Sequence, residues 1–168
     1  MERDRKLRHV TDLNREDAMH FLENRPKDKL FALKVSFFAT HAWDGQYPSY
    51  QPMNVTKERF YTSNETYPMP KTATDQHWKD LPPFFMETNE ARNRWRKRWE
   101  PDYYQDNIRD LYRMATEVDA VVGIVVKELK RQGVYNNTLL IFTTDNGNLQ
   151  GEHGLAEKVS GASCLAVL

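Results

Sequence analysis

The 168-residue sequence has a single cysteine, Cys164, which excludes an internal disulfide and a cysteine-rich metal site. It has no basic surplus either: 24 basic residues are balanced by 24 acidic ones, whereas a dedicated nucleic-acid binder usually carries an excess of Lys and Arg. No apolar run approaches the length of a membrane span, and no apolar core follows the charged N-terminus as it would in a signal peptide. We therefore expect neither nucleic-acid binding nor a membrane span.

Several common catalytic signatures are missing as well. The sequence contains no Gly-x-Ser-x-Gly, Walker loop, Rossmann glycine pattern or His-Glu-x-x-His. Aromatic residues make up 12% of the chain, which argues against disorder, and the length suits one domain or a piece of a larger one. Any function must therefore be read from other residues.

Helical periodicity is clearest over residues 102–131, where apolar side chains recur at alternating spacings of four and three. Pro101 suits the first turn of this helix, and Gly133 suits its C-terminal cap. A shorter helix is predicted over residues 15–24, with Asn14 as its N-cap.

Two apolar segments, residues 30–39 and 138–144, are predicted to be buried strands. Between the first of them and the long helix, residues 46–101 hold seven of the eight prolines and keep no periodicity, which indicates a long irregular connection. A strand, a connection with a helix, and a second strand form a βαβ-type unit, so the two strands are predicted to be parallel in one sheet.

Polar residues follow both predicted strands. His41 comes after the first, and Asp145 and Asn146 come after the second, so they are expected at one edge of the sheet, where open α/β sheets bind ligands. Carboxylate and amide oxygens suit Ca²⁺ or Mg²⁺, and Lys158, further along, adds a positive charge for an anion. Each residue alone has a plainer interpretation: Asp-Asn-Gly is a common turn, and a single histidine or lysine usually lies at the surface.

Glu152 and His153 stand between two glycines, in Gly-Glu-His-Gly. They are candidates for a general acid and base, although the flanking glycines equally suit a plain turn. Residues 91–99 combine Arg and Lys with two tryptophans, which fits either an anion-binding patch for a sulfated glycan or nucleic acid or a solvated helix face with its tryptophans on the core. The balanced charge of the chain favours the second interpretation.

Three N-glycosylation sequons begin at Asn54, Asn64 and Asn136. Such short patterns arise often by chance, so they support a secretory route only weakly.

The segment 138–158, TLLIFTTDNGNLQGEHGLAEK, resembles the signature of the sulfatase family, in which a strand ends in Asp-Asn or Asp-His, followed by Gly, Gly-Glu-His-Gly and a lysine. The preceding helix and its Gly-Val-Tyr-Asn-Asn-Thr turn, and the segment KVSFFATH at residues 34–41, are similar to further parts of that family. The resemblance implies an α/β fold, part of an alkaline-phosphatase-like sandwich with a largely parallel sheet flanked by helices. Residues 1–168 would then be a partial sulfatase catalytic domain, truncated at both ends, with residues 46–101 as a long irregular insertion.

The resemblance also implies roles. Asp145 and Asn146 would bind an active-site Ca²⁺, Lys158 would contact the sulfate group, and His41 would contact the sulfate or assist the leaving group. The substrate would be a sulfate ester, such as that of a sulfated glycan, and the protein would be secreted or lysosomal.

The sequence departs from the family in four places. It has no Cys/Ser-x-Pro-x-Arg motif, whose Cys or Ser becomes the formylglycine nucleophile, and Cys164 lies in the wrong context to serve. The paired upstream aspartates that complete the calcium site are missing, His41 lies in Thr-His-Ala-Trp where the family usually has Pro-His-x-Pro, and the tail after Lys158 differs. We therefore expect this chain alone to be inactive. A non-catalytic relative that binds sulfated glycan and a phosphoesterase of the same superfamily are the alternatives.

Overall fold

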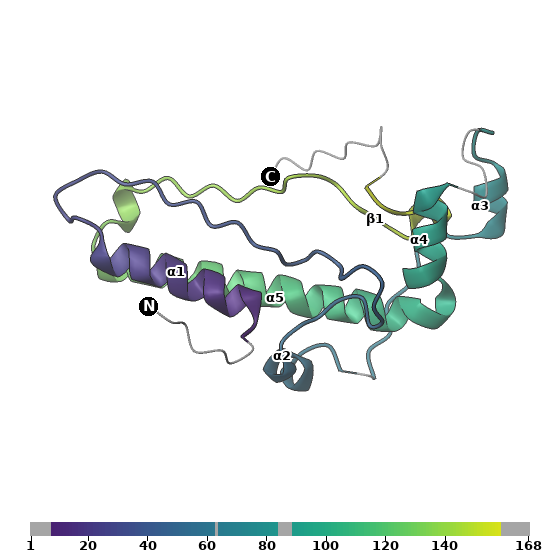
Figure 1. Ribbon diagram of the computed structural model, residues 1–168, viewed down its shortest axis with the longest axis horizontal. Coiled ribbons are helices and arrows are strands. Elements are labelled where there is room, and N and C mark those ends of the chain that lie inside the picture. The colour runs from purple at the N-terminus through teal and green to yellow at the C-terminus, as the bar shows by residue number, and fades with distance from the viewer. Residues whose placement is uncertain (1–7, 63, 84–88, 159–168) are drawn as a thin grey trace. The chain divides into compact units, whose positions relative to one another are not determined.

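The computed structural model of the chain describes residues 8–62, 64–83 and 89–158 (Figure 1). Cys164 and the tail after Lys158 lie outside the described residues. The chain divides into two compact units, one formed by residues 1–62 and 110–139 and the other by residues 63–109 and 140–168. The described helices are α1 (Val10–Asn24), α2 (Asn54–Arg59), α3 (Asp75–Lys79), α4 (Glu90–Arg98) and α5 (Pro101–Arg131), with 3-10 turns η1 (Tyr135–Asn137) and η2 (Glu152–Gly154) and strands β1 (Leu149–Gln150) and β2 (Ala156–Glu157).

Helix α1 begins five residues before its predicted start. His9 caps it, because its Nδ1 accepts a hydrogen bond from the backbone N–H of Thr11, 3.3 Å away. The predicted cap, Asn14, lies inside the helix and its amide nitrogen donates to the carbonyl of Ser36. The predicted C-terminus at Asn24, two residues before Pro26, is confirmed.

The prediction of α5 is confirmed to within one residue. Its end is a Schellman motif: Val134 N–H donates to Leu129 O at 3.1 Å, and Gly133 N–H donates to Lys130 O at 3.0 Å. Gly133 has φ +72°, so the predicted C-terminal glycine cap is confirmed. Most of the predicted apolar face is buried or half-buried, although Ala115 is exposed. The buried members are Tyr104, Ile108, Leu111, Val118 and Leu129, and the buried Met114 and Val121 extend the face beyond the prediction. No described helix is both long and apolar enough to cross a membrane.

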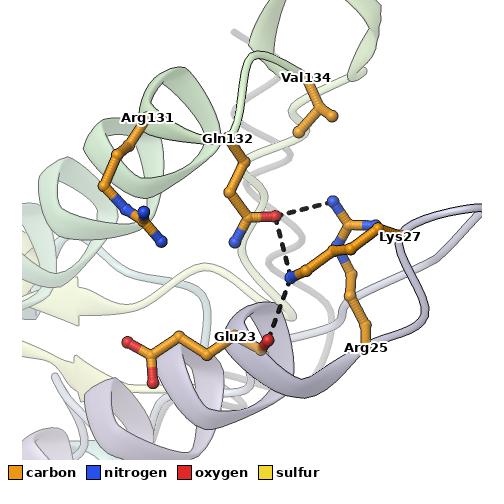
Figure 2. A pocket seen from close by; sticks show the side chains of 6 residues that line it. All are labelled: Glu23, Arg25, Lys27, Arg131, Gln132 and Val134. Carbon is orange, nitrogen blue, oxygen red and sulfur yellow. Dashed lines mark hydrogen bonds between the residues drawn. The ribbon is translucent and has the colours of Figure 1, made fainter.

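In the first unit, α1 runs beside the C-terminal half of α5, and a polar joint ties their ends together (Figures 1 and 2). Lys27 Nζ donates to the carbonyls of Leu22 and Glu23, which the end of α1 leaves open, and Gln132 Nε2 also donates to Leu22 O. Gln132 Oε1 accepts from Arg25 at 2.8 Å. A cavity of about 370 Å³ lies at this joint, and none of its lining residues belongs to the predicted sulfate or calcium site.

The two predicted buried strands are not confirmed in the part of the chain that the structure describes. Residues 30–39 and 138–144 form no strand. In the second segment the apolar side chains are exposed, since Leu139 is 84%, Ile141 75% and Phe142 62% exposed, whereas residues 30–39 alternate between exposed and half-buried side chains. The sheet that the structure does describe is the antiparallel pair β1–β2. A strand needs a neighbour for its backbone hydrogen bonds, and the described chain offers these two segments none. The predicted parallel pairing is therefore not observed.

Residues 46–101 are less irregular than predicted, since α2, α3 and α4 lie within them. Arg113 of α5 fixes the C-terminal end of α2, because its guanidinium donates to the carbonyls of Lys57, Phe60 and Tyr61. The backbone N–H of Met53, at the start of α2, donates to the buried carboxylate of Glu117 at 2.7 Å. Side chains of α5 thus replace the regular pairing that this proline-rich segment cannot make.

Candidate active site

The Gly-Glu-His-Gly sequence forms the turn of the β1–β2 hairpin. Leu149 pairs with Glu157 and Gln150 with Ala156, while Gly151 N–H donates to Leu155 O at 3.1 Å and closes the turn. The turn requires left-handed backbone at Gly154, whose φ is +64°. It is thus a tight connection closed by backbone hydrogen bonds.

An apolar cluster holds this hairpin against two helices of the same unit. Leu155, after the turn, is buried with Trp78 of α3 and Ala91 of α4, and Leu81 and Leu149 pack against the cluster. Ala156, the first residue of β2, has no exposed surface. The strand that leads to Lys158 is therefore anchored, although Lys158 itself is exposed.

Arg92 of α4 holds the turn by its backbone. Its Nη1 donates to the carbonyl oxygen of Gly154 at 3.0 Å, and its Nη2 lies 3.4 Å from a carboxylate oxygen of Asp75 at the start of α3. The guanidinium carbon lies 4.1 Å from the ring centre of Trp95 and 4.6 Å from that of Trp78. The Arg92 side chain is 4% exposed. Its guanidinium is therefore enclosed by two indole rings while it donates a hydrogen bond to the turn.

Glu152 and His153 have different surroundings within the turn. A carboxylate oxygen of Glu152 accepts the backbone N–H of Gln150 at 2.6 Å, so this carboxylate stabilises the hairpin. His153 is exposed, and its backbone N–H donates to the hydroxyl of Thr72 at 3.0 Å. The geometry favours the turn interpretation for Glu152 over a role as general acid.

Asp145 and Asn146 lie at a bend between residues 138–144 and β1, and both are exposed. With Lys158 they belong to the second unit, in which the hairpin separates them in sequence. No described group of three or more His, Cys, Asp or Glu side chains has the arrangement of a metal site. The two oxygen donors match the chemistry of calcium but are fewer than the about six to eight ligands that Ca²⁺ takes.

His41 belongs to the first unit. Its ring Nδ1 lies 2.6 Å from the carbonyl oxygen of Ala42, which can only accept, so Nδ1 carries the hydrogen and Nε2 is the acceptor nitrogen of the neutral ring. Its backbone N–H closes a turn onto Phe38 O at 2.8 Å. The prediction that His41 shares a sheet edge with Asp145 stays a prediction.

The basic segment around residues 92–98 forms α4, and Trp95 and Trp99 are buried as the helix-face interpretation predicts. That interpretation is wrong for Arg92 and Arg98, which are also buried. Arg94 donates to Glu90 at 2.8 Å, and this hydrogen bond lowers the pKa of the Glu90 carboxyl. The role of Arg92 was missed because charge alone predicted a solvated side chain. Its spacing of three residues from Trp95 places both on one helix face and would have indicated burial.

Comparison with known proteins identifies the class. The model of the sulfatase family matches residues 5–162, so the chain belongs to the sulfatase family. That family has the alkaline-phosphatase-like α/β fold that the sequence resemblance implied, although the described residues are mostly helical.

The similar curated proteins are sulfatases as well. The chain is 26% identical over 151 residues to the N-acetylglucosamine-6-sulfatase of Bos taurus, and the same holds for that of Capra hircus. In both cases the match covers 88% of this chain and 24% of the relative. An N-acetylglucosamine-6-O-sulfatase of Bacteroides thetaiotaomicron is 34% identical over 55 residues, which is 33% of this chain and 10% of the relative. No solved structure matches the chain.

Proposed function

We propose that this chain is part of a sulfatase that hydrolyses sulfate esters, and that it supplies the part of the active site that binds the sulfate group. The observation that carries the proposal is the family match over residues 5–162, which includes the anchored hairpin leading to Lys158. Because the chain spans 24% of the length of its mammalian relatives, the nucleophile is assigned to another part of the protein, as a formylglycine whose hydrate attacks sulfur.

The proposed site residues of this chain stabilise the negative charge of the sulfate group. Hydrolysis of a sulfate ester spreads negative charge over the sulfate oxygens, and a fixed ammonium beside them stabilises that charge more in the transition state than in the substrate. Lys158 has this role. His41 contacts the sulfate or assists the leaving group: with Nδ1 donating to Ala42 O, Nε2 is the ring nitrogen left for substrate, and it donates to a sulfate or leaving-group oxygen when the ring is protonated.

Asp145 and Asn146 supply part of a calcium site. Bound Ca²⁺ would withdraw charge from a sulfate oxygen. Carboxylate and amide oxygens are hard donors that suit this ion, and further oxygen ligands must come from elsewhere in the protein. A family-type pair of aspartates outside residues 1–168 is the proposed source.

The exposed apolar side chains after Thr138 support a further part of the protein that packs against this chain. Within the whole protein, residues 30–39 and 138–144 are assigned to the family's sheet, which would cover Leu139, Ile141 and Phe142. That arrangement would also place His41 and Asp145 at one sheet edge, as the sequence predicts.

The test compares the 168-residue chain with the full-length protein that contains it. The full-length protein is expected to hydrolyse 4-methylumbelliferyl sulfate, and the chain alone is expected to be inactive. If the full-length sequence contains no Cys or Ser in the formylglycine motif, or if the purified protein hydrolyses no sulfate ester, the proposal is wrong.

Two variants test the assignment of residues. Lys158→Ala is expected to lower kcat/KM by about a hundredfold or more, the loss typical of a group that stabilises developing charge. Lys79→Ala is the control, because Lys79 is an exposed lysine at the end of α3, outside the proposed site. Asp145→Asn is expected to weaken calcium binding, measured by titration calorimetry. Equal activity of the Lys158 and Lys79 variants would remove Lys158 from the site.

The names of the relatives suggest the substrate. A sulfate at the 6-position of N-acetylglucosamine is the proposed group, and N-acetylglucosamine 6-sulfate should be hydrolysed faster than the matched 6-phosphate. Faster hydrolysis of the phosphate would favour the phosphoesterase alternative.

We also propose that the protein enters the secretory pathway or lysosome. Asn54, Asn64 and Asn136 are all exposed, and a glycosidase-sensitive mass shift would show that these sequons are glycosylated.

The second alternative, glycan binding without catalysis, loses support from α4. Arg92 and Arg98 are buried, which leaves Arg96 and Lys97 as the exposed cations of the segment beside the half-buried Arg94. Heparin-affinity chromatography of wild type against an Arg96→Ala, Lys97→Ala variant tests it. Unchanged elution removes that alternative.

A further inference from the structure

We propose that Arg92 is a positioning residue for the sulfate site: its guanidinium fastens the turn at residues 151–154 to α3 and α4, and so fixes the strand that presents Lys158. The inference rests on the proposed function of Lys158 and deepens it, because it names what holds that side chain in place. Three kinds of contact carry it.

The first kind is directional. The two terminal nitrogens of Arg92 serve different elements: Nη1 donates to Gly154 O, at 3.0 Å, and Nη2 reaches Asp75 at the start of α3. The carbonyl of Gly154 is the last one before the chain enters the buried pair Leu155 and Ala156. Arg92 thus holds the turn at the point where the chain leaves it for β2.

The second kind is the pair of indole rings. Trp78 and Trp95 lie on the guanidinium at 4.6 and 4.1 Å, and they restrict it to one orientation. A planar guanidinium can stack on rings while its edge donates in fixed directions, whereas the ammonium of lysine is a point charge on a flexible stem. The site therefore depends on arginine specifically, and not on positive charge alone.

The third kind is the close fit of the turn itself. A Cβ built on Gly154 would clash with Nη1 of Arg92, so the guanidinium occupies the space that any larger residue would need. Thr72 adds a second fastening, since its hydroxyl accepts the backbone N–H of His153. The turn is consequently fixed on both sides of its left-handed backbone.

Energetics favour a geometric role over a purely stabilising one. Burial of a cation is costly, and a buried ion pair is often no better for stability than well-packed apolar residues of similar volume. The carboxylate partner here, Asp75, is 84% exposed, so its attraction is screened. Positioning explains why a guanidinium stands there. Lys158 follows Ala156 by two residues of anchored strand, so a displacement of Gly154 moves Lys158 with it.

The test uses Arg92→Lys, which keeps the charge and loses the directed pair of hydrogen bonds. In the full-length protein we expect kcat/KM for a sulfate ester to fall about tenfold, with KM raised as well as kcat lowered, because a misplaced Lys158 weakens its contact with the bound sulfate and with the transition state. A purely structural role would instead reduce the fraction of active molecules, which lowers kcat and leaves KM unchanged. Lys79→Arg on α3 is the matched control and should change neither constant.

A second measurement is independent of catalysis. In the 168-residue chain, Arg92→Lys should speed hydrogen exchange at the amides of Gly151, Gly154 and Leu155 by about tenfold, because these close the turn. Circular dichroism checks that the variant is folded. Unchanged KM in an active enzyme, or unchanged exchange, overturns the positioning role. If the wild-type full-length protein has no sulfatase activity, the proposed function is wrong. The link between Arg92 and Lys158 is then lost as well, whatever the result of the exchange measurement.

Discussion

Gly154 and Gly133 offer a paired test of how the hairpin turn is held. Both glycines have left-handed backbone, with φ +64° and +72°. A Cβ at Gly133 would meet no atom within 4 Å, whereas a Cβ at Gly154 would clash with the guanidinium of Arg92. The same substitution, glycine to alanine, therefore separates the conformational cost from the cost of displacing Arg92.

The two costs can be estimated. Left-handed backbone costs a non-glycine residue about 1–2 kcal/mol, and the reduced freedom of the unfolded chain returns about 0.4–1 kcal/mol. Gly133→Ala should therefore destabilise by about 1 kcal/mol. Gly154→Ala adds the loss of the Arg92 hydrogen bond, about 1–3 kcal/mol, so we expect about 3 kcal/mol in total.

Urea denaturation of both variants provides the measurement. Tryptophan fluorescence reports mainly the second unit, which contains the buried Trp78, Trp95 and Trp99, whereas Trp43 of the first unit is 56% exposed. Circular dichroism reports the long helix that Gly133 caps. In an Arg92→Ala background, Gly154→Ala should cost only about 1 kcal/mol, because the clashing group is gone. Equal destabilisation by the two single variants, or an unchanged cost in that background, would refute the assignment of Arg92.

Three further substitutions test the first unit and α5. Gly123→Ala should stabilise the protein by about 0.5–1 kcal/mol in urea denaturation, because Gly123 is inside α5 with open space around it; destabilisation would contradict the helix. Arg113→Ala should destabilise by about 1–3 kcal/mol and speed exchange in α2, while Arg113→Lys recovers part of the loss. Hydrogen bonds from Arg131 and then Gln132 lower the pKa of Glu128 to about 2, so its contribution to stability is complete above pH 4.5 and is lost as pH falls toward 2. Glu128→Gln should remove that part of the pH dependence in denaturation measured across this range, and an unaltered profile would show that Glu128 is not responsible.

The helices could be predicted because their causes are local. The periodic apolar face of α5, Pro101 at its start and Gly133 past its end all lie within one stretch of sequence, and the helix follows them. The start of α1 was missed for a local reason too: His9 is not a usual capping residue, yet its Nδ1 accepts the Thr11 amide. The prediction of a helix boundary fails where an unusual side chain makes the capping hydrogen bond.

In the candidate site too, features that depend on neighbouring residues could be predicted, and features that depend on distant residues could not. The order Asp-Asn, Gly-Glu-His-Gly and lysine identifies the family, and the match over residues 5–162 confirms that identification. The relation of His41 to Asp145 requires a sheet, and the two residues belong to different units of the structure. Arg92 could not be found by counting charges, because its burial depends on Trp78, which lies fourteen positions away and in another helix.

The exposed apolar residues of segment 138–144 show why a buried sheet is harder to predict from sequence than a helix. Burial of a large apolar side chain stabilises by about 1.5–3 kcal/mol, so Leu139, Ile141 and Phe142 together could contribute about 5 kcal/mol or more if a sheet covered them. The apolar pattern reports this potential gain correctly, but it does not say which residues would provide the cover. Helix α5 finds its cover within residues 8–158, whereas residues 138–144 do not. The sequence thus predicts the tendency to be buried, and whether that tendency is satisfied depends on residues beyond the segment itself.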